Sequence, residues 1–354
     1  MKKKALSALI VAAVATTTLL TACTTPSKQL QFSPNWQSDT FTGNELIGTV
    51  DESFVYDISF TSGDGMQGEK YDVEYCVDEN GNPQKGVYTY SVYGDAGTQK
   101  YVLEASCQIP VLYTYNGETK PHLETMTSRV EFLKTDTRLQ PISSYKKVDS
   151  YSPVLSEPTK VSECYIVYNY EIEIQYNANC SGSESITFTD HQGTYLADGT
   201  NDVAKETIKT DLSFDIDKSE YTYLDNEQIF FALRGLSNSA MQSTAYFNSY
   251  NYATRSVRNL IISPLENGTT ADFKESLVNG VALKDKTTEG KIDYNAITLA
   301  INEQNRGQSL ELWYAKTTDV SNNAYRNMLL KMKEPLMYNL GTLSYTLNSA
   351  TFAF

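Results

Sequence analysis

The segment Tyr165–Tyr176, with the sequence YIVYNYEIEIQY, decides the fold. Its even positions carry only Ile and Tyr, whereas its odd positions after Val167 carry Asn, Glu and Gln. Successive side chains of a β-strand point to opposite faces of the sheet. This alternation therefore predicts a strand with one face in the core and one face in water.

The same period of two recurs on both sides of this segment. The alternating apolar positions run from Phe54 to Phe60, from Tyr71 to Val77, from Tyr101 to Ile109 and from Ile208 to Ile216. Turn residues separate several of these stretches, with Gly or Asn in 62–65, 78–83 and 116–117. Parallel strands need long crossovers and are apolar on both faces, so half-polar strands with short turns indicate antiparallel pairing. We expect a mainly β protein of antiparallel meander sheets, as open-barrel or sandwich halves, with one or two short helices.

The clearest helical signal begins at Asp225. This residue is a candidate N-cap, Gln228 completes a capping box, and an apolar run that includes Phe231 ends at Gly235. A short helix cannot leave so many large apolar side chains in water, so it is expected to pack on a sheet.

Length and composition indicate a folded chain of about two domains. The chain has 354 residues, of which 12% are aromatic and only 20% are charged, unlike a disordered protein. We expect a β domain over 41–217 and a second β domain, open-barrel-like and containing the short helix, over 218–354. The formal net charge of -14 opposes binding to nucleic acids or to anionic headgroups.

The N-terminus carries an export signal. Three lysines at 2–4 precede the apolar stretch 5–20, and Leu20, Thr21, Ala22 and Cys23 follow in the order of a lipobox. This arrangement resembles the signal of bacterial lipoproteins. The resemblance implies that residues 1–22 are removed, that Cys23 is lipidated and that 23–40 is a tether. Acyl chains would then anchor the protein to a membrane of the cell envelope, outside the cytoplasm. An ordinary secretory signal with a cysteine near its end is the alternative.

A second resemblance covers the C-terminal part. The helix 225–236 is followed by strand patterns at 257–263, 292–301, 310–315, 335–336 and 341–347. This order is similar to uncharacterised bacterial envelope proteins related to periplasmic lipoprotein carriers, which are open β-barrels around a helix. It implies a curved sheet whose concave face holds an acyl chain or another apolar ligand. The long stretch 41–217 departs from that pattern.

No motif of a known catalytic or metal site is present. Nucleophile elbows and phosphate loops are missing, and His122 and His191 have no metal-ligand spacing and read as surface loop residues. Ser144 and Lys147 have a Ser-x-x-Lys spacing, but they lie in a strand pattern that turns them to opposite faces. Neither an enzyme, nor a cofactor, nor a bound metal is expected.

Four cysteines remain beyond the lipobox. Cys76 alternates with acidic residues and Cys107 with apolar ones, so the two are expected on opposite faces. Cys180 lies in a turn from which it could fold back towards Cys164. A disulfide between Cys164 and Cys180 is favoured, and buried free thiols are the alternative.

Three classes of function fit these features. An envelope lipoprotein that binds or carries an apolar or glycan ligand comes first, with Leu310, Leu312, Tyr314 and Phe231 lining a groove beside the helix. The helix could instead fill the curve of the sheet. A structural lipoprotein that contacts other envelope proteins is the second class, and an enzyme with an unrecognised pair of carboxylates is the third.

Replacing Cys23 by Ala tests the anchor. The acyl chains supply the membrane affinity, so Cys23→Ala should release the protein into the soluble fraction or leave an unprocessed precursor, as measured by fractionation and intact-mass analysis. A variant that is processed and retained like the wild type would contradict lipidation.

Overall fold

The computed structural model describes residues 51–64, 71–94, 97–133, 139–154, 158–178, 181–191, 206–212, 221–251, 256–270, 278–279, 292–300, 309–316 and 328–353. The lipobox and the tether lie outside these residues. Within them the chain is mostly strand, which confirms the predicted mainly β, antiparallel class with short helices.

The strands and helices are bounded as follows. The first strands are β1 (Asp51–Ser62), β2 (Tyr71–Tyr75), β3 (Gly86–Gly94), β4 (Lys100–Tyr115), β5 (Glu118–Leu133), β6 (Pro141–Pro153), β7 (Tyr165–Tyr176), β8 (Gly182–His191) and β9 (Glu206–Leu212). The later strands are β10 (Ala245–Asn251), β11 (Ser256–Thr270), β12 (Val278–Asn279), β13 (Ile292–Ala300), β14 (Leu310–Ala315), β15 (Leu329–Pro335) and β16 (Gly341–Ala353). The helical elements are η1 (Val161–Glu163), η3 (Asn226–Gln228), α1 (Ile229–Ala232), η4 (Leu233–Gly235), α2 (Asn238–Met241) and η10 (Met337–Asn339).

All these strands belong to one sheet. Its order is β10-β11-β13-β14-β15-β16-β1-β3-β4-β5-β6-β7-β8-β9, with β12 added beside β16 and β2 beside β4. The pairs along this path are antiparallel, and the short β12 pairs with β16 in parallel. The order begins at β10 and ends at β9 without closing, so the sheet is open.

The pairing of β1 with β16 joins the two ends of the described chain. The register runs from Asp51↔Ala353 to Ser62↔Gly341, with one bulge near Val55, and β1 pairs with β3 on its other side. Strands from both expected domains, 41–217 and 218–354, therefore share one sheet. A boundary near 217 does not separate two sheets.

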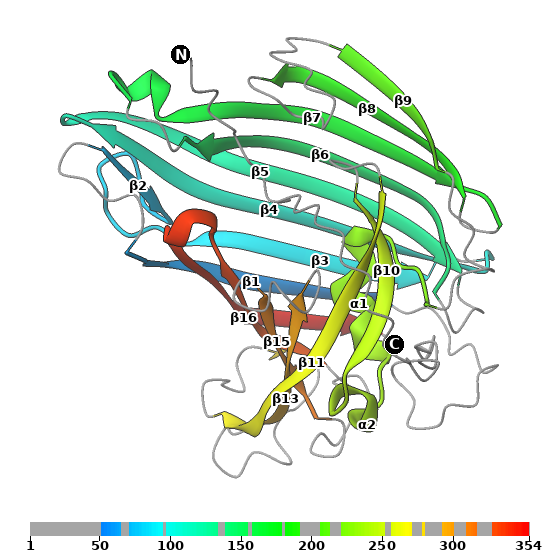
Figure 1. Ribbon diagram of the computed structural model, residues 1–354. Coiled ribbons are helices and arrows are strands. Elements are labelled where there is room, and N and C mark those ends of the chain that lie inside the picture. The colour runs from blue at the N-terminus through cyan, green and yellow to red at the C-terminus, as the bar shows by residue number, and fades with distance from the viewer. Residues whose placement is uncertain are drawn as a thin grey trace, which may run out of the picture.

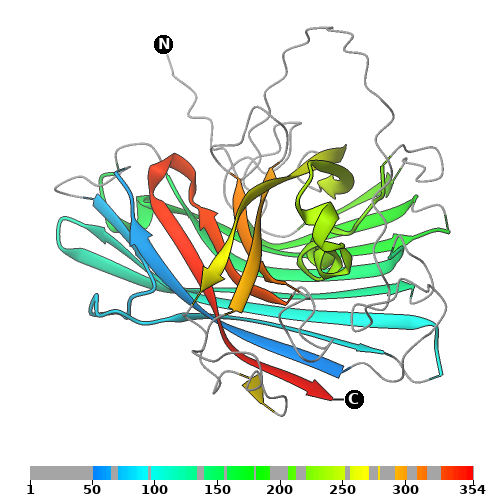
Figure 2. The ribbon, with the colours of Figure 1, turned by 90° about the horizontal axis from the view of Figure 1, so that it is seen from below.

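The sheet is strongly curved, and the short helix lies inside the curve. Figures 1 and 2 show β3–β9 as a broad bent layer, with β10, β11 and β13 crossing in front of it and α1 between them. Asp225 and Gln228 form the expected capping box, which confirms the predicted start of the helix. Phe231 contacts Phe132 of β5 at 5.4 Å between ring centroids. The helix thus fills one end of the concave face.

A buried ion pair fixes this helix to the sheet. The Arg234 guanidinium donates to the Glu52 carboxylate of β1, and both side chains are fully buried. The guanidinium also lies 5.1 Å from the centre of the Phe54 ring. Burial lowers the pKa of Arg234, but the charge of Glu52 and nearby tyrosines outweigh this effect and raise the pKa above its usual value.

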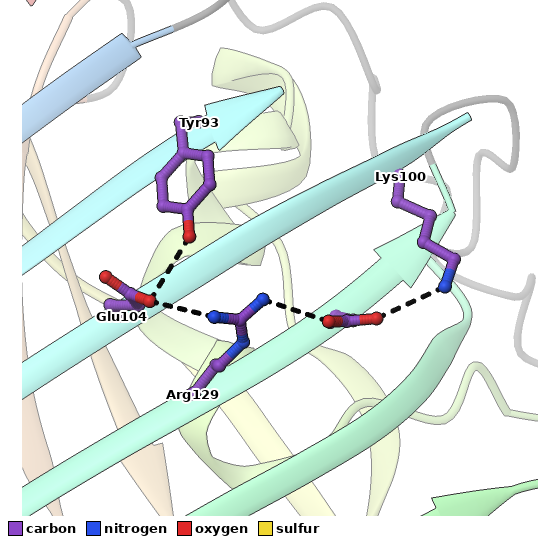
Figure 3. A network of polar contacts seen from close by, with 5 residues as sticks. Tyr93, Lys100, Glu104 and Arg129 are labelled. Carbon is purple, nitrogen blue, oxygen red and sulfur yellow. Dashed lines mark hydrogen bonds and ion pairs between the residues drawn. The ribbon is translucent and has the colours of Figure 1, made fainter. Parts of the chain in front are cut away.

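The convex face carries a chain of exposed charges (Figure 3). Arg129 of β5 donates to Glu104 of β4 at 3.2 Å and to Glu131 at 3.0 Å, and Lys100 reaches Glu131 at 3.2 Å. Partial burial raises the pKa of Glu131, but hydrogen bonds from Arg129 and Lys100 outweigh it and hold the pKa below its usual value. Such exposed pairs are screened by water and contribute little to stability.

Substitutions in these two ion pairs should have different effects on the free energy of unfolding. Arg234→Met leaves the Glu52 charge buried without its partner and should lower the free energy of unfolding by about 3–5 kcal/mol. Arg129→Met, on the convex face, should cost about 1 kcal/mol or less. Urea unfolding measures both. Equal effects of the two substitutions would show that the buried pair has no special role.

Candidate functional site

Beside the first turn of the helix, the concave face carries a group of polar and apolar side chains that we name the inner cluster. Its members come from five elements and are Cys107 (β4), Glu124 and Met126 (β5), Lys146 and Val148 (β6), Glu227 (η3) and Glu334 (β15). The register places Cys107 opposite Met126, and Met126 opposite Val148, in one row across three strands.

Curvature of the sheet brings this cluster together. Four strands, β16, β1, β3 and β4, separate β15 from β5 in the sheet order. At about 4.8 Å per strand, a flat sheet would hold Glu334 and Glu124 more than 20 Å apart. The charge of Glu334 nevertheless raises the pKa of Glu124, so curvature brings the two carboxyls much closer than a flat sheet would.

Glu124 is the most perturbed carboxyl of the cluster. Burial, followed by the charge of Glu334, raises its pKa to about 8, although the Tyr151 backbone amide hydrogen-bonds to it and opposes this shift. Its Oε1 atom is buried and has no hydrogen-bond partner. At neutral pH this carboxyl therefore holds a proton in surroundings that do not use its full hydrogen-bonding capacity.

Glu334 is held by a tyrosine. Tyr345 of β16 donates its hydroxyl to Glu334 Oε2 at 2.8 Å. Burial raises the pKa of Glu334 above its usual value, while the hydrogen bond from Tyr345 and the charge of Lys146 oppose the shift. Two carboxyls with raised pKa values thus share one side of the cluster.

Lys146 is already engaged by a third carboxylate. Its Nζ lies 2.8 Å from Glu227 Oε1, and the exposed fractions of the two side chains are 20% and 12%. Burial raises the pKa of Glu227, but the charge of Lys146 outweighs it and lowers the pKa below its usual value. Lys146 therefore acts on two carboxyls of the cluster, because its charge also lowers the pKa of Glu334.

Several side chains of the cluster are partly exposed to solvent. Cys107, Met126, Val148, Glu124 and Glu334 are all partly exposed, although they lie on the face that elsewhere forms the core. Burial nevertheless raises the pKa of the Cys107 thiol to about 12, with further contributions from Glu334 and Glu124.

An aromatic stack extends the concave face beside Glu124. The His122 ring stacks on Tyr151 at 3.6 Å between centroids, and Tyr151 stacks on Tyr165 at 4.2 Å. His122 Nε2 lies 3.3 Å from Asp149 Oδ1. The expectation that His122 is a surface loop residue is wrong, because it belongs to β5 and is held by these contacts.

The predicted groove residues lie elsewhere, in the filled end of the curve. Leu312 and Tyr314 are fully buried and Phe231 is 1% exposed, all within the main core, and Leu310 packs against that core. Tyr314 donates its hydroxyl to the Phe230 carbonyl at 3.2 Å. The helix and the C-terminal strands do meet as predicted, but at these residues the helix fills the curve. The sequence did not point to the inner cluster.

The remaining predicted positions are placed as follows. Cys164 is a buried thiol that donates to the Lys160 carbonyl at 3.7 Å, whereas Cys180 lies outside the described residues, so their disulfide stays a prediction. Ser144 is buried and Lys147 is exposed on the same strand, as expected for opposite faces.

Neither a metal-binding group nor a helix able to span a membrane occurs in the described part of the chain. It contains no group of three or more His, Cys, Asp or Glu side chains that could hold a metal ion. None of its helices has the length and apolar character needed to cross a membrane.

Comparison with known proteins finds a distant structural likeness. No family model and no curated protein sequence matches this chain. Among solved structures, the chain is similar to a β-barrel-like protein from Brucella abortus, a domain of unknown function. The two are 10% identical with a TM-score of 0.45, over 86% of this chain and 98% of that one. This likeness identifies neither a ligand nor an activity.

The raised pKa of Glu124 predicts how stability depends on pH. Between about pH 4.5 and about pH 8 the folded protein holds a proton that the unfolded chain has lost, so stability falls as pH rises through this range. Glu124→Gln cannot ionise, and it should reduce the loss of melting temperature between about pH 5 and about pH 9.

Glu173→Gln is the matched control, because Glu173 is an exposed residue of β7. It should keep the pH dependence of the wild type. If Glu124→Gln kept that dependence too, Glu124 would not be the titrating group.

Proposed function

We propose that this protein is a lipid-anchored protein of the bacterial cell envelope that binds a small ligand non-covalently on the concave face of its sheet. The observation that carries the proposal is the inner cluster, where partly exposed apolar side chains adjoin a buried carboxyl oxygen without a hydrogen-bond partner. A mostly apolar surface with a few polar groups is typical of small-molecule sites. The lipobox at Cys23 supports the anchor.

The site differs from the one that the sequence favours. The groove beside the helix is filled at Leu312 and Tyr314, so the binding surface that we propose lies further along the same concave face, around Met126 and Glu124. The ligand class remains an apolar or glycan compound with at least one polar group. A purely apolar ligand would leave Glu124 without a partner.

The carboxyl pair also supports a second candidate. A protonated acid that faces another carboxyl is the arrangement that hydrolysis of a glycosidic bond needs. Glu124, with its pKa near 8, could act as the proton donor in such a reaction. The two candidates differ in whether the bound compound is recovered intact or cleaved.

Ligand retention tests the proposed site. Protein purified without denaturation from its native membrane should retain a compound that native mass spectrometry detects and denaturation releases. Met126→Arg places a charged side chain in the row of Cys107 and Val148, and it should lower the retained fraction at least tenfold.

Thr127→Arg is the matched control, because Thr127 is exposed on the opposite face of the same strand. It should leave retention unchanged. Should Met126→Arg fail to fold, as judged by circular dichroism, Met126→Phe fills the same space without a charge. Equal retention by the wild type and all three variants would reject this surface as the site. Recovery of a cleaved glycan would favour the enzyme instead.

A further inference from the structure

The strand β9 ends the sheet order, and its outer edge pairs with no other strand of the described chain. On its inner side the register with β8 runs from Gly182↔Leu212 to Phe188↔Glu206, so that side is paired over the full length of the strand. Figure 1 shows β9 at the rim of the sheet. The backbone N–H and C=O groups along such an edge can pair with a strand of another chain.

The opposite end of the sheet is covered by the chain itself. Residues 222–224 run beside β10, where the Leu224 amide donates to the Asn248 carbonyl at 2.9 Å and the Asn248 amide donates to the Thr222 carbonyl at 2.7 Å. Tyr223 also forms a parallel bridge with Asn248. Of the two edges that end the sheet order, β9 is therefore the one that the described chain leaves for a partner.

The outer face of β9 carries one positive and one negative charge. Lys209 and Asp211 are both exposed and stand two residues apart, which places them on the same face of the strand. Opposite them on β8 lie Ser185 and Ser183, which are uncharged. Neither charge forms an ion pair with another described residue. A lone lysine at a sheet edge opposes association, but a lysine with an aspartate beside it can match a second copy of itself.

Charge selects one register for such a match. When an antiparallel strand pairs with its own copy, opposite residues share a face only if the pairing is centred on a residue. Centring on Lys209 places two lysines opposite each other, and centring on Asp211 places two aspartates opposite each other. Like charges in these positions are destabilising. Centring on Thr210 places Lys209 of each copy opposite Asp211 of the other.

We propose that β9 pairs with β9 of a second copy of this chain, in the antiparallel register centred on Thr210. The two sheets then continue into one, with two cross-strand Lys–Asp pairs on the outer face. The same register places Leu212, which belongs to the second core, opposite Ile208 of the other copy. Both copies use the same surface, so the interface closes as a dimer with twofold symmetry and does not extend into a fibre.

A lipid anchor would favour this small interface. Two copies held in the same membrane meet at a much higher effective concentration than two copies free in solution. The contacts themselves belong to β9 and involve neither the inner cluster nor Met126. Rejection of the proposed ligand site would therefore leave the dimer untouched, and the Cys23→Ala fractionation tests the anchor separately.

A cysteine at the centre of the register tests the pairing in the membrane. Opposite Cα atoms of an antiparallel pair lie about 4.5–5.5 Å apart, within the range of about 4.4–6.8 Å that a disulfide spans. Full-length Thr210→Cys, oxidised in its native membrane, should run as a disulfide-linked dimer on a non-reducing gel. Wild type controls for the native cysteines. Glu173→Cys is the matched control, because Glu173 is exposed in the same row as Ser185 and Lys209 but two strands inside the edge.

Charge reversal tests the register. In the Thr210→Cys background, Lys209→Glu places acid opposite acid and Asp211→Lys places lysine opposite lysine, so each should lower the cross-linked fraction about fivefold or more. Two differently tagged chains, one with each reversal, should recover the cross-link when they are produced together, because every acid of one chain then faces a lysine of the other. Glu173→Lys should leave cross-linking unchanged.

Sedimentation of the lipidated protein in detergent, without the cysteine substitution, measures the same association independently. Wild type should show a monomer–dimer equilibrium that each charge reversal weakens and that mixing the two reversed chains restores. The proposal is overturned if wild type is monomeric and Thr210→Cys does not cross-link, or if the reversals do not change the dimer. A cross-linked adduct whose mass differs from two copies would also overturn it, and would identify another protein as the partner of this edge.

Discussion

The buried pair of Glu52 and Arg234 determines where the concave face is filled and where it stays accessible. Removing two charges from water is costly unless each finds the other with good geometry, so the helical segment can dock only where Arg234 reaches β1. That constraint places Phe231 against Phe132 at one end of the curve. The same docking places the first turn of the segment, at Glu227, against Lys146 of the inner cluster.

Much of the fold follows from local patterns that can be read directly in the sequence. The alternation predicted for Tyr165–Tyr176 is present from Tyr168 to Gln175, where Tyr168, Tyr170, Ile172 and Ile174 are buried in a second core. The capping box at Asp225 forms as predicted. The alternation fails at Cys76, whose positive φ of 59° turns it into the main core, against which Cys107 also packs. The two cysteines are therefore not on opposite faces, because one left-handed residue resets the phase of a strand.

The site could not be predicted in the same way. Periodicity tells which face of a strand is buried, but not how far the sheet bends. Glu124 and Glu334 each look like ordinary polar residues among apolar neighbours, and their sequence separation gives no hint that the charge of one acts on the other. Leu312 and Tyr314 were plausible walls for a groove because they are large and apolar, and the same property places them in the packed core. Partly exposed positions on a buried face are visible only once the curvature is known.

The pairing of β1 with β16 has a consequence for how the chain folds. Tyr56 donates its hydroxyl to the Leu329 carbonyl at 2.9 Å, across a sequence separation of 273 residues. Contacts of such high order form slowly, because the chain entropy of closing the loop is lost before the contact is gained. Until residues 341–353 arrive, β1 presents an unpaired apolar edge, which is a template for association with other chains. Folding of this sheet must therefore follow synthesis of nearly the whole chain, and a truncation that removes β16 would expose two strand edges at once.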